Sequence, residues 1–295
     1  MRFVTFSAKG EEGLAVAAAG GALHGLLASD AHFPGDLGSL IRRGARALEE
    51  AGRRLLGGPS FQQEEVRFLP PLGRPPKIIC VGLNYHEHSR ESGFEQPSYP
   101  ALFVRFNSCL LGHRAPLVRP RVSRQLDYEG ELVAVIGRPG RHIPKTSALE
   151  HVIGYSIFND ASIRDYQMRT TQWTVGKNFD GTGAFGPWLV TADELPPGAR
   201  GLQLRTRLQG KVMQSASTAE LIFDVPTLVT LLSEAFTLEA GDVIVTGTPS
   251  GVGFARKPPI FMQPGDCCEV EIEGIGTLVN PVVDEGQAVP AERLP

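Results

Sequence analysis

The sequence predicts a strand-rich α+β protein. Glycine and proline account for 34 and 23 of the 295 residues, whereas only 7% of the residues are aromatic. This composition favours many turns and short strands over a helical bundle. Most apolar segments have the length of a strand and do not alternate with regular helices, which argues against a Rossmann or barrel α/β fold.

The chain divides by pattern into a small N-terminal α+β domain (residues 1–70) and a larger domain (71–295). The proline-rich stretch 68–77, FLPPLGRPPK, is interpreted as a linker between them. A helix is expected over 36–54, where leucine and isoleucine recur at helical spacing. The short strands expected before that helix are 2–6, 14–18 and 22–27, the last two forming a hairpin around Gly20 and Gly21.

The larger domain is predicted to be mostly strands with three helices. The helix over 225–236 has the strongest signals, since Asp224 is suited to cap it and Pro226 falls in its first turn. The other helices are expected around 84–92 and 161–168. The expected strands are 78–85, 101–106, 131–137, 152–159, 187–191, 202–209, 242–246, 268–273 and 276–280.

Composition and charge limit the classes of function. The net charge is −3 and no basic run occurs, so a nucleic-acid partner is not expected. The most apolar stretch, residues 14–28, is too short for a membrane span, and the first residues lack the apolar segment of a signal peptide. The four cysteines include no C-x-x-C pair, which favours free thiols in the cytoplasm over disulfides or a zinc site.

Two glutamates stand at the entrance of an apolar strand. In RQLDYEGELVAVIG (124–137), Glu129 and Glu131 are two residues apart, so their side chains project from the same face of the strand. Carboxylates this close repel unless a cation neutralises them, and Mg²⁺ prefers such oxygen ligands. The alternative is a solvated strand end with exposed glutamates. Asp127 is assigned to support of the site.

Three further segments carry polar groups that suit catalysis. Asp160 follows the apolar run YSIFN and is either a third oxygen ligand or the N-cap of the next helix. His88 and Glu91 are spaced i and i+3, so a helix would place the carboxylate beside the imidazole, as a general base requires. The alternative is a polar surface turn. Lys177 lies between an apolar run and an aromatic residue and is either a buried cation facing an anionic substrate or a surface lysine.

A glycine-rich segment, VTGTPSGVG (245–253), follows an apolar strand. It matches neither the Walker A pattern nor G-x-G-x-x-G, and it also misses G-x-S-x-G, because Thr248 stands where the first glycine is needed. The segment is interpreted either as a plain turn or as a turn that places Thr248 and backbone amides near an anion.

Five motifs in a fixed order resemble the fumarylacetoacetate hydrolase superfamily over residues 75–285. They are VGLNYHEH, DYEGELVAVIG, IFNDASIRDYQ, GKNFD and GDVIVTGTPSGVG. The stretch ARKPPIFMQPGD (255–266) is similar to the subgroup of acylpyruvase-like and hydroxymuconate-isomerase-like proteins. The resemblance implies a mixed β-sandwich roll with a small N-terminal domain, a homodimer, and a small-molecule oxo acid as substrate.

The resemblance also implies a role for each matching residue. The metal ligands for Mg²⁺ or Mn²⁺ would be Glu129, Glu131 and Asp160, and the dyad that activates water or moves a proton would be His88 and Glu91. Lys177 would be catalytic, and the substrate would be bound by Gln167, Thr248 and Arg105. The chain departs from the family pattern at Phe106, where proline is common, at Ile163, where alanine is usual, and at Gly181-Thr182-Gly183, where relatives often carry bulkier residues.

The function expected from this resemblance is hydrolysis of a C–C bond in a β-diketo acid, such as an acylpyruvate from aromatic catabolism. His88, oriented by Glu91, would deprotonate water, and Lys177 would stabilise the oxyanion. The same site is compatible with decarboxylation of oxaloacetate or with isomerisation or hydration of a hydroxymuconate-like acid, because all of these reactions pass through an enolate. A remote alternative is a non-catalytic member that binds metal or ligand.

Overall fold

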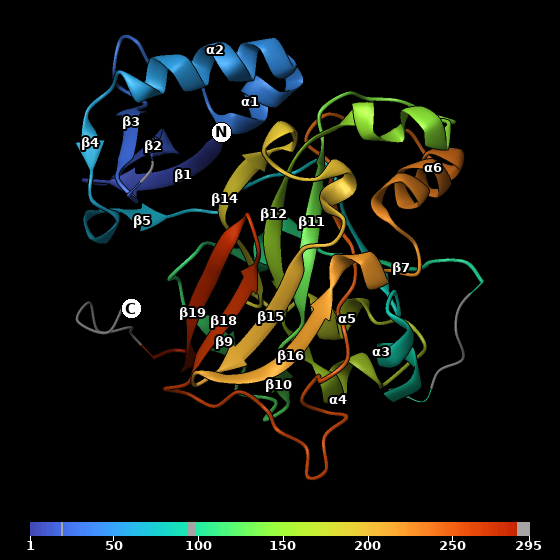
Figure 1. Cartoon of the computed structure of the whole chain (residues 1–295). Coiled ribbons are helices and arrows are strands. Elements are labelled where there is room, and N and C mark those ends of the chain that lie inside the picture. The colour runs from blue at the N-terminus through green and yellow to red at the C-terminus, as the bar shows by residue number, and fades with distance from the viewer. Residues whose placement is uncertain (19, 92, 94–97, 288–295) are drawn as a thin grey trace.

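Two β-sheets dominate the computed structural model, which describes residues 1–18, 20–91, 93 and 98–287 (Figure 1). In the described residues the larger sheet has twelve strands and the smaller has five. The strand order of the larger sheet is β4 (Ser60–Phe61), β3 (Leu23–Leu27), β2 (Glu11–Ala17), β1 (Arg2–Ala8), β14 (Gly183–Thr191), β12 (Val152–Asp160), β11 (Gly130–Ile136), β17 (Val243–Val245), β6 (Ile78–Gly82) and β7 (Ala101–Val104). Two short strands lie outside this order: β5 (Arg67–Phe68) pairs with β1, and β8 (Leu110–Leu111) pairs with β14.

The smaller sheet packs against one face of β11 and β12. Its order is β16 (Lys211–Ser217), β15 (Gln203–Leu208), β18 (Cys267–Ile272), β19 (Gly276–Asp284) and β9 (Leu117–Arg119). Leu132 of β11 shares a buried cluster with Leu204 and Val270 of this sheet. At Gly130 the contact is so close that a Cβ would lie 2.2 Å from the Thr206 hydroxyl. The strand-rich α+β fold class predicted from the sequence is confirmed.

Alternation along β11 decides where its side chains point. All seven of its residues are buried. Leu132 and Ala134 face the cluster that includes the smaller sheet, whereas Val133 and Val135 belong to a second cluster on the opposite face. Because side chains alternate along a strand, Glu131 shares the face of Val133 and therefore points away from the smaller sheet.

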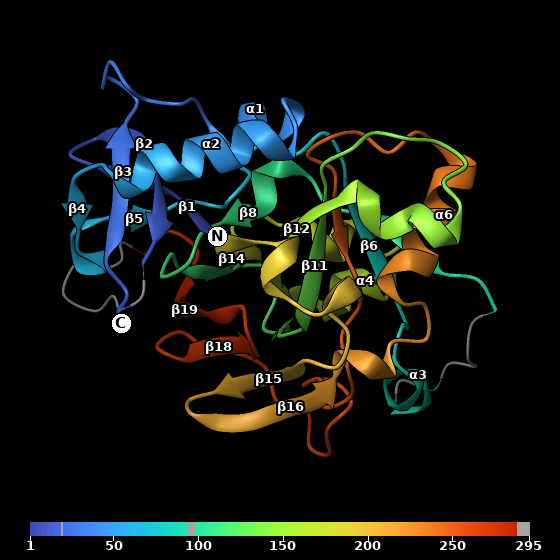
Figure 2. The ribbon, with the colours of Figure 1, turned by 45° about the horizontal axis from the view of Figure 1, so that its top comes forward.

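The N-terminal strands continue the larger sheet, because β1 pairs antiparallel with β14. Helices α1 (Leu37–Arg42) and α2 (Ala45–Leu56) pack together beside these strands (Figures 1 and 2). The single helix expected over 36–54 is wrong in one respect. The helix is interrupted at Gly44, whose φ of 90° lies outside the helical region. The division of the chain near residue 70 stays a prediction.

Most other predicted elements are present. Strands β2 and β3 form the expected hairpin. Helix α6 (Val225–Ala235) is capped by Asp224, whose side chain accepts a hydrogen bond from the Thr227 amide at 3.0 Å. Helix α3 spans His86–Glu91, and the last residue of the helix expected over 84–92 lies outside the described residues.

Other parts of the prediction differ from the structure. The helix expected over 161–168 is only α4 (Arg164–Gln167), because β13 (Ser162–Ile163) pairs with β10 (Leu126–Asp127) before it. Strand β16 is not among the expected strands, since its sequence KVMQSAS is largely polar. A short helix, α5 (Thr174–Lys177), follows α4. Within the described residues, no helix is long and apolar enough to cross a membrane.

Candidate active site

Three carboxylates meet where β11 and β12 run side by side. Gly130 of β11 pairs with Asn159 of β12, so Asp160 lies opposite Glu129, and the Asp160 amide donates to the Glu129 carbonyl at 2.8 Å. One oxygen from each of Glu129, Glu131 and Asp160 lies within 4.8 Å of the others, and all three residues are buried. The alternatives of a solvated strand end and a helix N-cap therefore do not hold in this structure.

Lys177 lies between two of these carboxylates. Its Nζ is 2.5 Å from Glu129 Oε2 and 2.6 Å from Asp160 Oδ2, and its side chain is only 2% exposed. Burial by itself would lower the pKa of Lys177, but Asp160 and Glu129 outweigh it and raise that pKa. Lys177 is thus a buried ammonium group and not a surface lysine.

Arg105 holds Asp160 from the other side. Its Nε pairs with Asp160 Oδ1, and its Nη2 donates to the Ala161 carbonyl at 2.6 Å. Its Nη1 bonds to Cys109 and Thr182. The guanidinium group is fully buried and does not line the pocket described below. Its contacts orient a carboxylate, whereas the resemblance assigns it to substrate binding.

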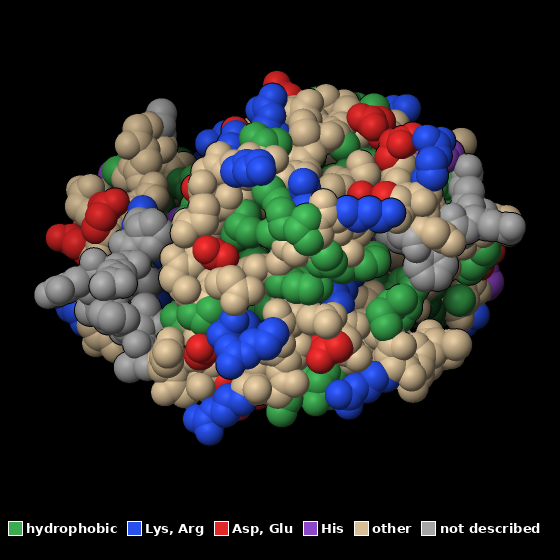
Figure 3. Space-filling view, turned by 90° about the horizontal axis from the view of Figure 1, so that it is seen from below, with side chains coloured by type: hydrophobic (Ala, Val, Ile, Leu, Met, Phe, Trp, Pro, Cys, Tyr) green, Lys and Arg blue, Asp and Glu red, His purple; other side chains and the backbone are tan. Residues whose placement is uncertain are grey.

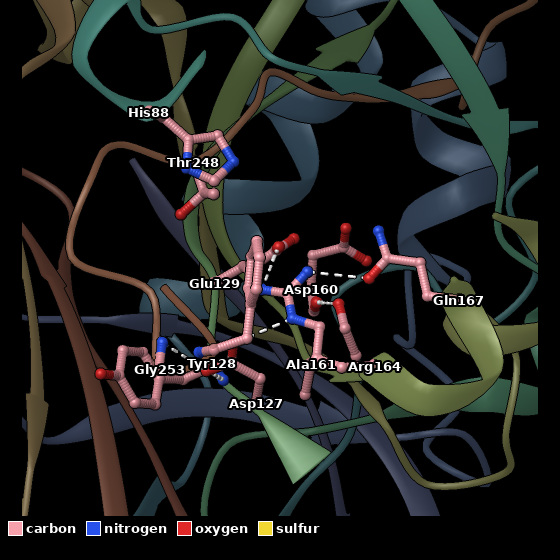
Figure 4. Close-up of polar contacts among 12 residues, drawn as sticks. His88, Asp127, Tyr128, Glu129, Asp160, Ala161, Arg164, Gln167, Thr248 and Gly253 are labelled. Atoms are coloured by element: carbon pink, nitrogen blue, oxygen red, sulfur yellow. Dashed lines mark hydrogen bonds and ion pairs between the residues drawn. The ribbon is translucent and has the colours of Figure 1, made fainter. Parts of the chain in front are cut away.

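Arg164 is a further residue of the site, which the sequence pattern alone does not single out. Its Nη2 lies 2.6 Å from Glu129 Oε1, its Nε donates to Asp127 Oδ2 at 2.8 Å, and its Nη1 donates to Gln167 Oε1 at 2.8 Å. Figure 4 shows Arg164 beside Glu129, Asp127 and Gln167, with His88 and Thr248 on the other side of Glu129. The available signal in the sequence is the motif NDASIRD, in which Arg164 follows Asp160 by four positions.

The charges of this cluster fit a divalent cation. Four buried carboxylates, Asp127, Glu129, Glu131 and Asp160, face the buried side chains of Arg105, Arg164 and Lys177. Burial and the neighbouring charges of Asp160 and Glu129 raise the pKa of Glu131 well above its usual value. The candidate ligand atoms are all oxygen atoms, which hard cations such as Mg²⁺ and Mn²⁺ prefer. A divalent ion on Glu129, Glu131 and Asp160 would supply further positive charge to these carboxylates.

His88 and Glu91 form the expected pair on α3. His88 Nδ1 lies 3.0 Å from Glu91 Oε1, and the His88 ring is buried. Both oxygens of Glu91 also accept from the Gly251 amide, at 3.0 and 2.9 Å. Glu91 therefore orients the imidazole, which leaves Nε2 of His88 for a reacting group.

The glycine-rich loop donates its backbone amides to the carboxylates of the site. The Gly247 amide donates to Glu131 at 2.5 Å, and the Gly251 amide donates to Glu91. The Gly253 amide donates to Asp127 at 2.8 Å. The loop is therefore not a plain turn, because it places backbone amides near anions. These anions are carboxylates of the protein itself.

Several of these groups, among them His88, Glu129 and Lys177, line one pocket of small volume, about 40 Å³. Its polar wall includes Thr248, whose hydroxyl donates to the Gly130 carbonyl at 3.0 Å. Figure 3 shows the end of the molecule where α3 and α4 lie, with apolar side chains in a band bordered mainly by lysine and arginine. The residues lining the pocket are Val81, Gly82, Leu83, His88, Phe103, Glu129, Glu131, Arg164, Gln167, Met168, Trp173, Lys177, Thr248 and Phe254.

Known proteins are similar to this chain in sequence. Residues 77–283 match the family model "Fumarylacetoacetate (FAA) hydrolase C-terminal". The human protein "Oxaloacetate tautomerase FAHD2A, mitochondrial" is 40% identical over 267 residues, which cover 90% of this chain and 85% of that protein.

Two solved structures superpose along nearly the whole chain. A fumarylacetoacetate hydrolase from Exiguobacterium antarcticum has a TM-score of 0.83 and 39% identity, covering 97% of this chain and 100% of that one. A maleylpyruvate hydrolase from Sphingobium, in complex with manganese(II) and pyruvate, has a TM-score of 0.77 and 29% identity with the same coverage. The superfamily predicted from the five motifs is confirmed: this chain belongs to the fumarylacetoacetate hydrolase family.

Proposed function

We propose that this protein is a divalent-metal-dependent enzyme that interconverts the enol and keto forms of a short 2-oxo acid, with oxaloacetate as the substrate. The observation that carries the proposal is the meeting of the Glu129–Glu131–Asp160 cluster, the His88–Glu91 pair and Lys177 around one small pocket. The 40% identity to a human oxaloacetate tautomerase favours this reaction over others of the same chemistry.

Glu129, Glu131 and Asp160 would hold Mg²⁺ or Mn²⁺. When bound, such an ion supplies positive charge that stabilises negative charge on the oxygens of an oxo acid. The manganese in the maleylpyruvate hydrolase complex supports this assignment.

The chain's own residues move and hold the protons. In ketonisation the enol O–H bond breaks and a C–H bond forms at C3, so no atom is gained or lost. We assign the transfer of the proton to C3 to Nε2 of His88, because Nδ1 of His88 is bonded to Glu91. Lys177 and Gln167 face the pocket and would donate hydrogen bonds to the substrate's oxygens.

The test is a substrate panel followed by two assays. Enol-oxaloacetate, an acylpyruvate and a hydroxymuconate are each mixed with protein and Mg²⁺ or Mn²⁺, against a blank with metal alone. Loss of the enol absorbance without formation of pyruvate identifies tautomerisation, whereas coupled reduction of pyruvate by lactate dehydrogenase reveals decarboxylation or hydrolysis. Enol loss at the blank rate contradicts the proposed reaction.

Hydrolysis of an acylpyruvate-type C–C bond is the second candidate. It is favoured by the maleylpyruvate hydrolase neighbour that holds pyruvate and manganese. In that reaction His88 would deprotonate water, and Lys177 would stabilise the oxyanion. Pyruvate released from the acylpyruvate, faster than enol loss from oxaloacetate, would establish this candidate in place of the first.

Glu131→Ala tests the metal site itself. The substitution should abolish turnover and weaken metal binding, because it removes one of three ligand carboxylates. Turnover and Mn²⁺ binding are measured on the same preparation. A Glu131→Ala variant that keeps the full rate after chelation contradicts the ligand assignment. If the wild type binds Mn²⁺ tightly but turns over no substrate of the panel, the protein is a non-catalytic member of the family.

A further inference from the structure

Both polar atoms of the Gln214 side chain make hydrogen bonds next to the candidate metal ligands. It lies on β16, at the edge of the smaller sheet, and is 1% exposed. Its Oε1 accepts from the Gly130 amide at 3.0 Å. Its Nε2 donates to the Thr248 hydroxyl and to the Pro249 carbonyl, both at 2.8 Å.

These bonds join the two segments that position the ligand Glu131. Gly130 stands between Glu129 and Glu131 on the chain, and Gly247, whose amide donates to Glu131, directly precedes Thr248. Thr248 in turn donates to the Gly130 carbonyl. The amide of Gly130 is thus bonded to Gln214, and its carbonyl is bonded to Thr248.

We infer that Gln214 is a positioning residue of the divalent-metal site, which fixes the Glu129–Glu131 segment against the glycine-rich loop. The inference rests on the proposed function in that it requires the metal site. Partners that orient metal ligands commonly change metal affinity 10- to 100-fold when they are lost. Gln214 acts through Gly130 and Thr248 and touches none of the three carboxylates in the contacts described.

An amide side chain suits all three partners of Gln214. A glutamate at this position would still accept from Gly130, but it could not donate to the Pro249 carbonyl, and it would add negative charge beside an acidic cluster. A methionine has a similar size and would remove the hydrogen bonds that Gln214 makes to the Gly130 amide and the Pro249 carbonyl.

The matched control is Gln203 on the neighbouring strand β15. Its Nε2 donates to Leu204, Ser215 and Ala216, all within the smaller sheet, at 3.0 to 3.2 Å. Gln203→Met therefore removes a comparable set of hydrogen bonds without a link to the metal ligands.

The experiment measures Mn²⁺ binding by the electron paramagnetic resonance signal of free Mn²⁺. The wild type, Gln214→Met, Gln214→Glu and Gln203→Met are compared, together with their melting temperatures in a chelator. We expect both changes at Gln214 to raise the Kd for Mn²⁺ by about tenfold or more, while Gln203→Met stays within about twofold of the wild type. Saturating Mn²⁺ should recover most of the kcat of Gln214→Met.

Three results would overturn the inference. If the folded Gln214 variants bind Mn²⁺ as tightly as the wild type, the positioning role is wrong while the metal site stands. If Gln203→Met weakens Mn²⁺ binding as much as Gln214→Met, the effect belongs to general destabilisation of the sheet. Failure of the wild type to bind Mn²⁺ overturns the proposed metal site, and this inference with it.

Discussion

At the scale of single residues, the site is a set of buried charges that hold one another in place. Lys177 bonds to Glu129 and Asp160, and Arg164 bonds to Glu129 and Asp127. Buried charges are costly unless they are paired, and removal of one partner leaves the other uncompensated. The carboxylates therefore depend on these cations for stability.

Lys177→Met should destabilise the protein in the presence of a chelator. Two buried carboxylates would lose their shared ammonium group, a loss of about 3–5 kcal/mol by comparison with other broken buried pairs. The free energy of unfolding in urea, measured in a chelator and again with Mg²⁺, checks this, and Mg²⁺ should offset part of the loss. Arg53→Met, which breaks an exposed pair with Glu49, is the control and should cost less than about 1 kcal/mol. Equal losses in both variants would contradict the argument.

At the scale of elements, short backbone features decide where helices and strands end. Gly44 separates α1 from α2 with a φ of 90° and a ψ of 174°. That conformation is almost restricted to glycine, because a Cβ would clash with the backbone. Similarly, Gln209 and Gly210 both have positive φ and form the tight turn between β15 and β16.

Gly44→Ala should therefore lower stability by about 1–3 kcal/mol through backbone strain. Gly57→Ala is the matched change at the other end of α2, where φ is −83° and a Cβ would meet only an ordinary contact at 3.5 Å. Urea unfolding of both variants tests the prediction. Strain at Gly44 is refuted if the two variants are equally stable.

His113 links the segment after β8 to β19 and should make stability depend on pH. Its Nδ1 accepts from the Val279 amide at 3.1 Å, and its ring packs against Phe68. Burial, with a smaller effect of Arg114, lowers the pKa of His113 to about 3. Since an unfolded histidine has a pKa of about 6.5, the unfolded state binds more protons than the folded state between about pH 6.5 and pH 3.

The contribution of His113 is thus fully present above about pH 6.5 and is lost as the pH falls, by up to about 1.4 kcal/mol per pH unit. Unfolding free energies at pH 5 and pH 7 should differ less in His113→Gln than in the wild type. His32→Gln, at an exposed position, should leave the difference unchanged. The same pH difference in all three proteins would disprove the prediction.

At the scale of the whole molecule, the edge of the larger sheet exposes apolar side chains. Strand β7 is the last strand of the sheet, and Leu102, Val104 and Phe106 in and after it are 40%, 45% and 52% exposed. An exposed apolar edge strand is a surface on which another chain can pack. We propose that the protein is a homodimer that covers this edge.

Light scattering on the purified protein should accordingly give twice the mass of the chain, 31.8 kDa. Val104→Lys should shift the mass toward that of the monomer, because it places a charge in the contact. Val212→Lys, at an exposed position on β16, is the control. A wild type that is monomeric at micromolar concentration would contradict the proposal.

Much of the fold and the site can be predicted from the sequence, because those features depend on local pattern. The spacing of Glu129 and Glu131 predicts that they share a strand face, and i, i+3 spacing predicts the contact between His88 and Glu91; both pairs lie close together in the structure. Strand β16 is not predicted because its sequence alternates only weakly between apolar and polar residues. Gln214, which lies on this strand, is therefore not predicted as part of the site either.

The local pattern of the sequence indicates which carboxylates could form a metal site and where most of the strands of the larger domain lie. Three features become visible only in the folded chain: Asp160 lies opposite Glu129, Arg105 contacts Asp160 and does not line the pocket, and the glycine-rich loop donates to the site's carboxylates. The physical reason is that strand register and the pairing of buried charges join positions far apart in the chain, where local periodicity carries no information.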